Sequence, residues 1–159
     1  MNSSKKIRHL QSLLYTSGMG IILFSLWSGI RDVEFFFEEL RGILHTVYLE
    51  NPILSEKTIY VFLGVIFFGF VACMILLHIY IGRNAVLFSI GRIKNNRYVI
   101  WAIIDLCASF YSYAFDWQSV AWKELIRPDR LVLFIIDITS NIILVEIVVF
   151  SIILKRMRN

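Results

Sequence analysis

Residues arranged for catalysis or metal binding are scarce in this 159-residue chain. Its two cysteines, Cys73 and Cys107, lack the spacing of a redox or metal motif. Each lies in a long apolar run, where a cysteine usually serves as a small core residue. Zinc-binding, phosphate-loop and nucleophile-elbow motifs are also absent. These absences exclude enzymes built on those motifs, and they predict a protein without a metal or a cofactor.

Charge is scarce as well. Charged residues make up 18% of the sequence and hydrophobic residues 58%, whereas a soluble domain has about 45–50% apolar residues. Four apolar runs are long enough for a helix to cross a bilayer, which takes roughly 20 residues. They are Leu13–Ile30, Thr58–Ile81, Tyr98–Phe115 and Leu131–Leu154. The alternating pattern of membrane strands is absent. The sequence therefore predicts an all-α membrane protein, a bundle of four transmembrane helices that forms one domain over residues 1–159.

Acidic residues are missing from three segments that flank these runs. The N-terminal segment, the stretch Gly82–Arg97 and the C-terminal segment carry basic charges alone, namely Lys5, Lys6, Arg8, Arg83, Arg92, Lys94, Arg97, Lys155, Arg156 and Arg158. The other two connections contain acids and bases together. Lys and Arg accumulate in the cytoplasmic loops of membrane proteins. The pattern thus predicts cytoplasmic N- and C-termini in a protein of the inner or plasma membrane of the cell.

The stretch Gly82–Arg97 is predicted to form a loop between the second and third spans. We expect it to be partly helical and to lie as a basic amphipathic segment on the inner membrane surface. Arg83, Arg92, Lys94 and Arg97 are candidates for contact with anionic lipid headgroups, which attract basic side chains near the surface. A cytoplasmic protein is the alternative partner. Nucleic acid is excluded, because the basic residues are not interleaved with an aromatic stacking platform.

A second amphipathic pattern lies in the first acidic connection. Apolar residues recur every three or four positions from Val33 to Val47, and charged residues fall on the opposite face. The pattern predicts a separate helix over about residues 33–47, with Asp32 as its N-cap and Asn51-Pro52 at its end. Its apolar face is expected to lie on the outer leaflet or to cover the bundle. A docking surface for an extracellular partner is the alternative.

Three acids lie inside the predicted spans: Asp105, Asp137 and Glu146. A carboxylate at the bilayer centre costs at least ~2.5–3.5 kcal/mol on insertion scales, so such residues are usually turned inward, paired or protonated. The helical rise places Asp105 and Asp137 about 6 Å apart in depth, and the two are expected to face one cavity open to the outside. Glu146 is about half a turn out of phase with Asp137. It is expected nearer the cytoplasm, at a level that His78 approaches.

The candidate intramembrane polar site consists of these three acids together with Ser109 and Asn141. Three roles remain open for it. In the first, the acids are structural and form hydrogen bonds with nearby polar groups, such as Ser17 and Ser140. In the second, Asp105 and Asp137 form a cation or proton site in a small transporter or channel subunit. In the third, the same two residues share a proton as a catalytic dyad that activates water.

Two families of four-span proteins resemble this architecture. Lipoprotein signal peptidases have a similar size and catalytic aspartates near the outer face, to which Asp105 and Asp137 are similar. Their motifs place an Asn close to each Asp, whereas here Asp105 has no nearby Asn and Asn141 follows Asp137, so the peptidase activity is not carried over. Immunity proteins against pore-forming colicins are small four-span proteins with both termini inside. The stretch Asn51-Pro52-Ile53-Leu54-Ser55 is similar to the Asn-Pro entry of some of them, which implies a protein that binds another protein in the membrane.

The sequence therefore favours a small multi-pass membrane protein without enzymatic activity. It is expected to be an accessory, regulatory or immunity-type protein that acts through contacts between helices or between proteins. A small transporter or channel subunit that uses Asp105 and Asp137 is the second hypothesis, and an intramembrane aspartyl-type peptidase is the third. The expected partners are membrane lipids and either another membrane protein or further copies of this chain.

Overall fold

A computed structural model of the chain describes residues 3–50, 56–119 and 128–158. Within these ranges the chain forms four helices and no strand. The helices are α1 (Ser3–Glu50), α2 (Glu56–Ser89), α3 (Tyr98–Ser119) and α5 (Pro128–Arg158). The all-α fold predicted from the sequence is confirmed.

Three helical segments are long and apolar enough to cross a membrane: Ser4–Ile30, Lys57–Ser89 and Ile135–Arg158. They correspond to the first, second and fourth predicted spans. The third predicted span lies in α3, whose described apolar part, Tyr98–Tyr111, is shorter than the other three. Large apolar side chains are nevertheless exposed on all four helices, among them Leu23, Val65, Phe110 and Ile135. Such surfaces are stable in lipid and unfavourable in water, so the helices are those of a membrane-embedded protein.

The prediction of a separate helix over residues 33–47 is wrong in one respect. These residues are helical, but α1 runs without interruption from Ser3 to Glu50, so Asp32 lies inside a helix and does not cap a new one. The reason is that this region contains no proline, and charged residues such as Arg31 and Glu34 are compatible with a helix interior. The predicted stop at Asn51-Pro52 lies outside the described residues, which for α1 end at Glu50.

The predicted loop over Gly82–Arg97 is also shorter than expected, because α2 continues to Ser89. The helix stops where Gly91 adopts a φ of 79°, a left-handed conformation that glycine enters without steric cost. The amide of Arg92 donates to the carbonyl of Leu87, and the amide of Gly91 donates to that of Phe88. This is the Schellman arrangement of a helix C-terminus. Basic residues had marked the end of the apolar run, but they do not mark the end of the helix.

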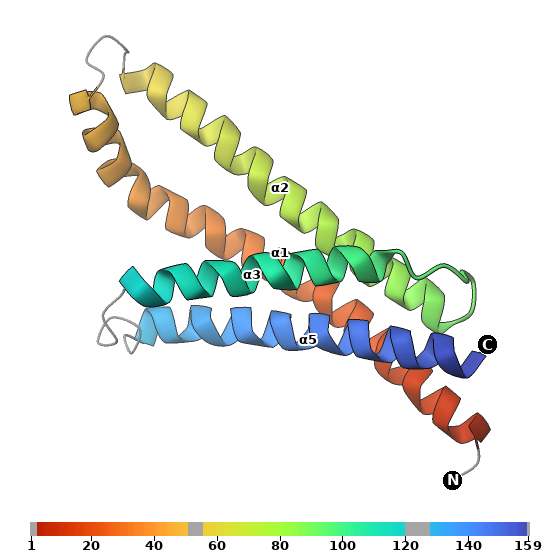
Figure 1. Ribbon diagram of the computed structural model, residues 1–159. Helices are drawn as coiled ribbons and strands as arrows, with labels where there is room; N and C mark the ends of the chain where they lie inside the picture. The colour runs from red at the N-terminus through yellow and green to blue at the C-terminus, as the bar shows by residue number, and fades with distance from the viewer. Residues whose placement is uncertain (1–2, 51–55, 120–127, 159) are drawn as a thin grey trace.

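Figure 1 shows two antiparallel pairs of helices, α1 with α2 and α3 with α5. The pairs lie together at the end of the molecule that carries both chain termini and the α2–α3 connection, and they diverge toward the other end. The main apolar core draws on all four helices. It contains Leu14, Ile21, Ile81, Ala85, Phe88, Tyr98, Val99, Ala102, Leu106, Leu144, Ile147 and Leu154.

A smaller apolar cluster lies between the C-terminal half of α1 and the N-terminal half of α2. Phe36 of α1 is 8% exposed and packs against Ile59 and Leu63 of α2. Its ring stacks on that of Phe67, with centroids 4.1 Å apart and planes inclined by 13°. Phe36 belongs to the amphipathic pattern of residues 33–47. At this position the apolar side of the pattern is therefore covered by α2.

Candidate functional site

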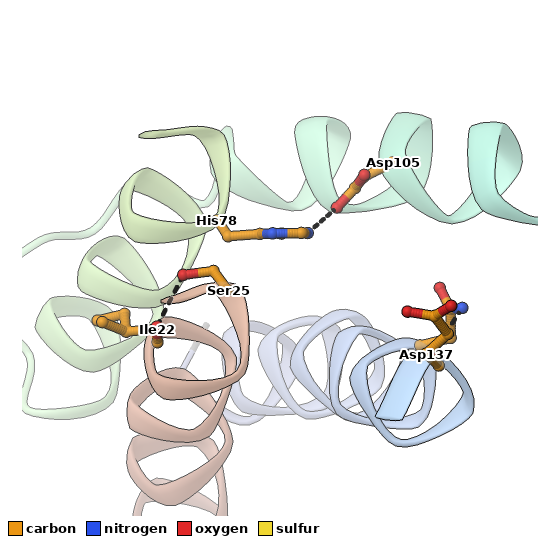
Figure 2. Close-up of polar contacts among 6 residues, drawn as sticks. Ile22, Ser25, His78, Asp105 and Asp137 are labelled. Atoms are coloured by element: carbon orange, nitrogen blue, oxygen red, sulfur yellow. Dashed lines mark hydrogen bonds and ion pairs between the residues drawn. The ribbon is translucent and has the colours of Figure 1, made fainter. Parts of the chain in front are cut away.

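A contact between α2 and α3 brings together two titratable side chains. Nε2 of His78 lies 2.7 Å from Oδ2 of Asp105, and Figure 2 shows the imidazole and the carboxyl group pointing at one another. The side chains are 13% and 2% exposed. A buried carboxyl group is costly unless it has a partner, and the imidazole supplies that partner. His78 was expected near Glu146; the structure places it on Asp105 instead.

The acid of α5 nearest the C-terminus has a different partner. Ser17 of α1 donates a hydrogen bond of 2.7 Å to Oε2 of Glu146, and Ser17 is only 5% exposed. Hydrogen bonds of this kind between membrane helices contribute to their association. Ser17 was one of the structural partners expected from the sequence, and here it joins α1 to α5.

The remaining members of the candidate intramembrane polar site do not join either contact among the described interactions. Asp137 lies on α5, and Figure 2 shows its carboxyl group apart from the His78–Asp105 contact. The side-chain amide of Asn141 donates to the backbone carbonyl of Asp137 at 3.0 Å. Ser109 is half-buried on α3. The partner that the structure gives Asp105 is His78.

Polar contacts also join α5 and α1 to the C-terminus of α2, at the end of the molecule that carries the chain termini. Arg158 of α5 donates from Nη1 to the carbonyl of Phe88 at 2.8 Å and from Nη2 to that of Ser89 at 2.9 Å. Its guanidinium lies 5.2 Å from the centroid of the Phe88 ring. Gln11 of α1 donates to the same Ser89 carbonyl at 2.9 Å. A cation at this place satisfies carbonyls at the C-terminus of α2 and complements the negative end of its dipole.

The four basic residues expected to contact lipid or a partner are all exposed. Arg83 lies on the last turns of α2, Arg92 and Lys94 lie in the α2–α3 connection, and Arg97 directly precedes α3. Figure 1 shows this connection at the same end as the two termini. The segments that contain only basic charges therefore lie together in space.

The described residues contain no group of three or more His, Cys, Asp or Glu side chains that could hold a metal ion. Cys73 and Cys107 are free thiols, one on α2 and one on α3, and both are exposed. Each buried polar side-chain atom in the described ranges has a hydrogen-bond partner. What the described site offers is thus a buried histidine–carboxylate contact between α2 and α3 and a hydrogen bond between α1 and α5.

The His78–Asp105 contact was missed from the sequence, although a signal for it exists. Counted from the middle of the α2–α3 connection, His78 and Asp105 lie within about one helical turn of the same level, given the rise per residue. Two antiparallel neighbours therefore bring the histidine of one helix to the level of the acid of the next.

Comparison with models of protein families, with curated proteins and with solved structures finds no match for this chain.

Proposed function

We propose that this chain is a multi-pass protein of the cell membrane that works by binding another membrane protein, in an accessory, regulatory or immunity-type role without chemistry of its own. Its four helices form one transmembrane bundle, with both termini and the α2–α3 connection in the cytoplasm. The positions of the basic segments at one end of the molecule (Figure 1) support this orientation. The exposed apolar surfaces of all four helices support the membrane location.

One observation carries the proposed role: two of the three acids in the spans form hydrogen bonds between helices. Glu146 accepts from Ser17, and Asp105 is paired with His78. Polar groups in these positions hold the helices of a bundle together. The large apolar side chains that the helices expose do not take part in these contacts. A second transmembrane protein is the partner whose apolar helices would pack against them.

Site-specific crosslinking in intact membranes tests this role. A photoreactive residue is placed in turn at Val65, Phe110 and Ile152, which are exposed on α2, α3 and α5. We expect adducts with one protein from one face, and adducts with lipid alone from the others. A tryptophan substitution on the reactive face should abolish function at an unchanged amount of protein, while the same substitution on another face leaves function intact. Adducts with lipid alone at every position would contradict the proposal.

A small transporter or channel subunit is the second candidate, and the His78–Asp105 contact is what favours it. Proton pathways in membranes are commonly built from Asp, Glu and His side chains. This candidate predicts that Asp105→Asn or Asp137→Asn abolishes function while the protein still accumulates. The proposed accessory role predicts that Asp105→Asn lowers the amount of folded protein and that its effect on function follows that amount.

The orientation has its own test. Reporter fusions at the two termini and in the 90–97 connection should be active only in the cytoplasm, and fusions in the 51–55 and 120–127 connections only outside. A fusion in the 120–127 connection that reports a cytoplasmic position would show that α3 does not cross the membrane.

A further inference from the structure

The apolar runs of α1 and α2 end at different levels of the hairpin that the two helices form. On α1 the run ends at Ile30, and the rest of the helix carries Arg31, Asp32, Glu34, Glu38, Glu39, Arg41 and Glu50. On α2 no Asp, Glu, Lys or Arg occurs between Lys57 and Arg83. A charged half of α1 and an apolar half of α2 therefore belong to the same antiparallel pair.

The register of the pair is fixed by contacts along its length. The residues in contact are Gly18 with Gly82, Gly29 with Val71 and Ile75, and Phe36 with Phe67. Arg31 and Asp32 lie between the last two contacts, so they are level with residues 67–75 of α2. The charged half of α1 runs beside residues 56–70, the N-terminal half of α2.

This register decides how much of α2 crosses the membrane. If α2 crossed with the whole run Thr58–Ile81, the charged half of α1 beside it would lie at the depth of the hydrocarbon core, where each charge is costly. If the charges of α1 mark the limit for both helices, α2 crosses from about Val71 to Ser89, which is close to the roughly 20 residues that a crossing takes. Arg83 then lies near the inner end, where a long basic side chain reaches the headgroups.

Beyond that limit the pair forms an arm, which consists of residues 31–50 of α1 and 56–70 of α2. Figure 1 shows the arm diverging from α3 and α5. Within it, α2 packs on Phe36 of α1 through Ile59, Leu63 and Phe67. Its other large apolar side chains are exposed, namely Tyr60, Val61, Phe62, Val65, Ile66, Phe68 and Phe70.

Lipid is the cover that fits this exposed surface. The surface continues that of the crossing part of α2, since Leu76, Phe70, Val65 and Phe62 are all exposed to a similar degree. One helix of the arm supplies the charges and the other supplies the apolar side chains. Such a division is typical of an element that lies in the membrane interface with its apolar side in the acyl chains.

We propose that the arm lies in the interface of the leaflet opposite the chain termini, with α2 toward the acyl chains and α1 toward water. In the orientation proposed above this is the outer leaflet. The sequence predicted that the apolar face of residues 33–47 itself lies on the leaflet or covers the bundle; here α2 covers that face at Phe36, and α2 makes the contact with lipid. The inference rests on the membrane location and is independent of the accessory role.

Spin labels on the full chain in lipid nanodiscs measure the depth of α2. Cys73 and Cys107, both exposed, are replaced by Ala, and single cysteines are introduced at Val61, Val65, Phe70, Leu76 and Tyr80. Power saturation with oxygen, which concentrates in hydrocarbon, and with a nickel chelate, which stays in water, gives the depth of each label. We expect similar, shallow depths at Val61 and Val65 and the greatest depth at Tyr80. A crossing over the whole run would place the greatest depth at Phe70.

Helix α5 provides the control in the same sample. Its apolar run, Leu131–Leu154, is predicted to cross in full, and Ile135, Ile142 and Val149 are exposed along it. Labels at these positions should be deepest at Ile142 whether or not the arm lies in the interface. A depth profile on α2 with its maximum at Phe70 would overturn the proposal.

A matched pair of substitutions tests the same point without labels. Val65 and Leu76 are 68% and 65% exposed, and Val65 lies nearer the middle of the run Thr58–Ile81. In the interface a lysine reaches water, whereas in the hydrocarbon it is costly. We therefore expect Leu76→Lys to lower the amount of folded protein at least about threefold more than Val65→Lys does. The opposite order would show that α2 crosses with its whole run and would overturn the proposal.

Two further results would overturn the lipid contact. Labels at Val61 and Val65 that the nickel chelate reaches freely would show that the arm projects into water. Labels shielded from both reagents would show that protein covers the arm, either a partner or a second copy of this chain. The inference also predicts that the photoreactive residue at Val65 forms adducts with lipid, so the partner of the accessory role is expected at Phe110 or Ile152. Failure of that role would leave the depth profile unchanged.

Discussion

The carbonyl oxygen of Gly18 on α1 lies where the side chain of residue 82 on α2 would begin: a Cβ built on Gly82 would be 2.5 Å from that oxygen. The reverse holds too, since a Cβ on Gly18 would lie 2.8 Å from the carbonyl oxygen of Gly82. The backbones of α1 and α2 are therefore in direct contact at this level. Small residues permit such close approach between membrane helices.

The first prediction concerns this backbone contact. In Gly82→Ala the new methyl group meets a backbone oxygen, so the two helices must move apart, and overpacking of this kind typically costs about 1–3 kcal/mol. Gly69→Ala is the matched control, because it lies on the same helix and its Cβ would meet nothing within 4 Å. The control should be neutral or gain up to about 1 kcal/mol from helix propensity. Unfolding in mixed detergent and SDS micelles measures both, and equal stabilities would refute the contact.

The second prediction concerns the hydrogen bond between Ser17 and Glu146. Ser17→Ala removes the donor and should destabilise the protein by about 1 kcal/mol, the range measured for such bonds in membranes. Thr16→Ala is the control: Thr16 is the adjacent residue, is exposed, and donates to the carbonyl of Ser12 within α1, so its effect should stay below about 0.5 kcal/mol. Glu146→Gln keeps a hydrogen-bond acceptor, so it should lower the free energy of unfolding by less than Glu146→Leu does. The same unfolding assay tests this order of stabilities.

The location of the membrane helices was predictable because hydropathy is a property of local composition. The runs around Leu23, Val65 and Ile142 coincide with helices long and apolar enough to cross a bilayer. The helix ends were less predictable. Charged residues at Arg31 and Arg83 marked the limits of the apolar runs, yet a helix backbone continues past such residues until a conformation like that of Gly91 stops it.

The partners of the intramembrane acids were predictable only in part. That each acid needs a partner follows from the cost of burying charge, and Ser17 was among the groups expected to supply one. The pairing of His78 with Asp105 depends on how α2 and α3 are rotated and on where they cross. Rotation and crossing are set by the packing of the whole core and not by the depth of a residue in its own span.

The third prediction concerns Arg158, which donates to the carbonyls of Phe88 and Ser89 at the C-terminus of α2. In Arg158→Ala these carbonyls lose charged donors, so the last turn of α2 and the connection after it should open more often. Arg158→Lys should rescue only in part, because an ammonium group lacks the planar fork that reaches two acceptors at once. Hydrogen exchange measured over residues 86–92 reports the opening. Arg156→Ala, an exposed neighbour, should leave exchange unchanged; an equal rise in both variants would mean that charge alone is responsible.

The fourth prediction concerns the basic residues of the α2–α3 connection. Arg83, Arg92, Lys94 and Arg97 are exposed at the end of the molecule that carries the termini, and basic clusters beside a membrane attract anionic headgroups. Replacing all four by Gln should reduce the anionic phospholipid that stays bound to the purified protein, measured by native mass spectrometry from nanodiscs of mixed composition. Binding to the wild type should weaken as salt is raised, because exposed charges are screened.

Lys57→Gln changes an exposed cation at the opposite end of α2 and should leave lipid retention as it is. If the four-residue variant retains as much anionic lipid as the wild type, these side chains serve a protein partner or the orientation of the chain, and lipid is not their counterpart.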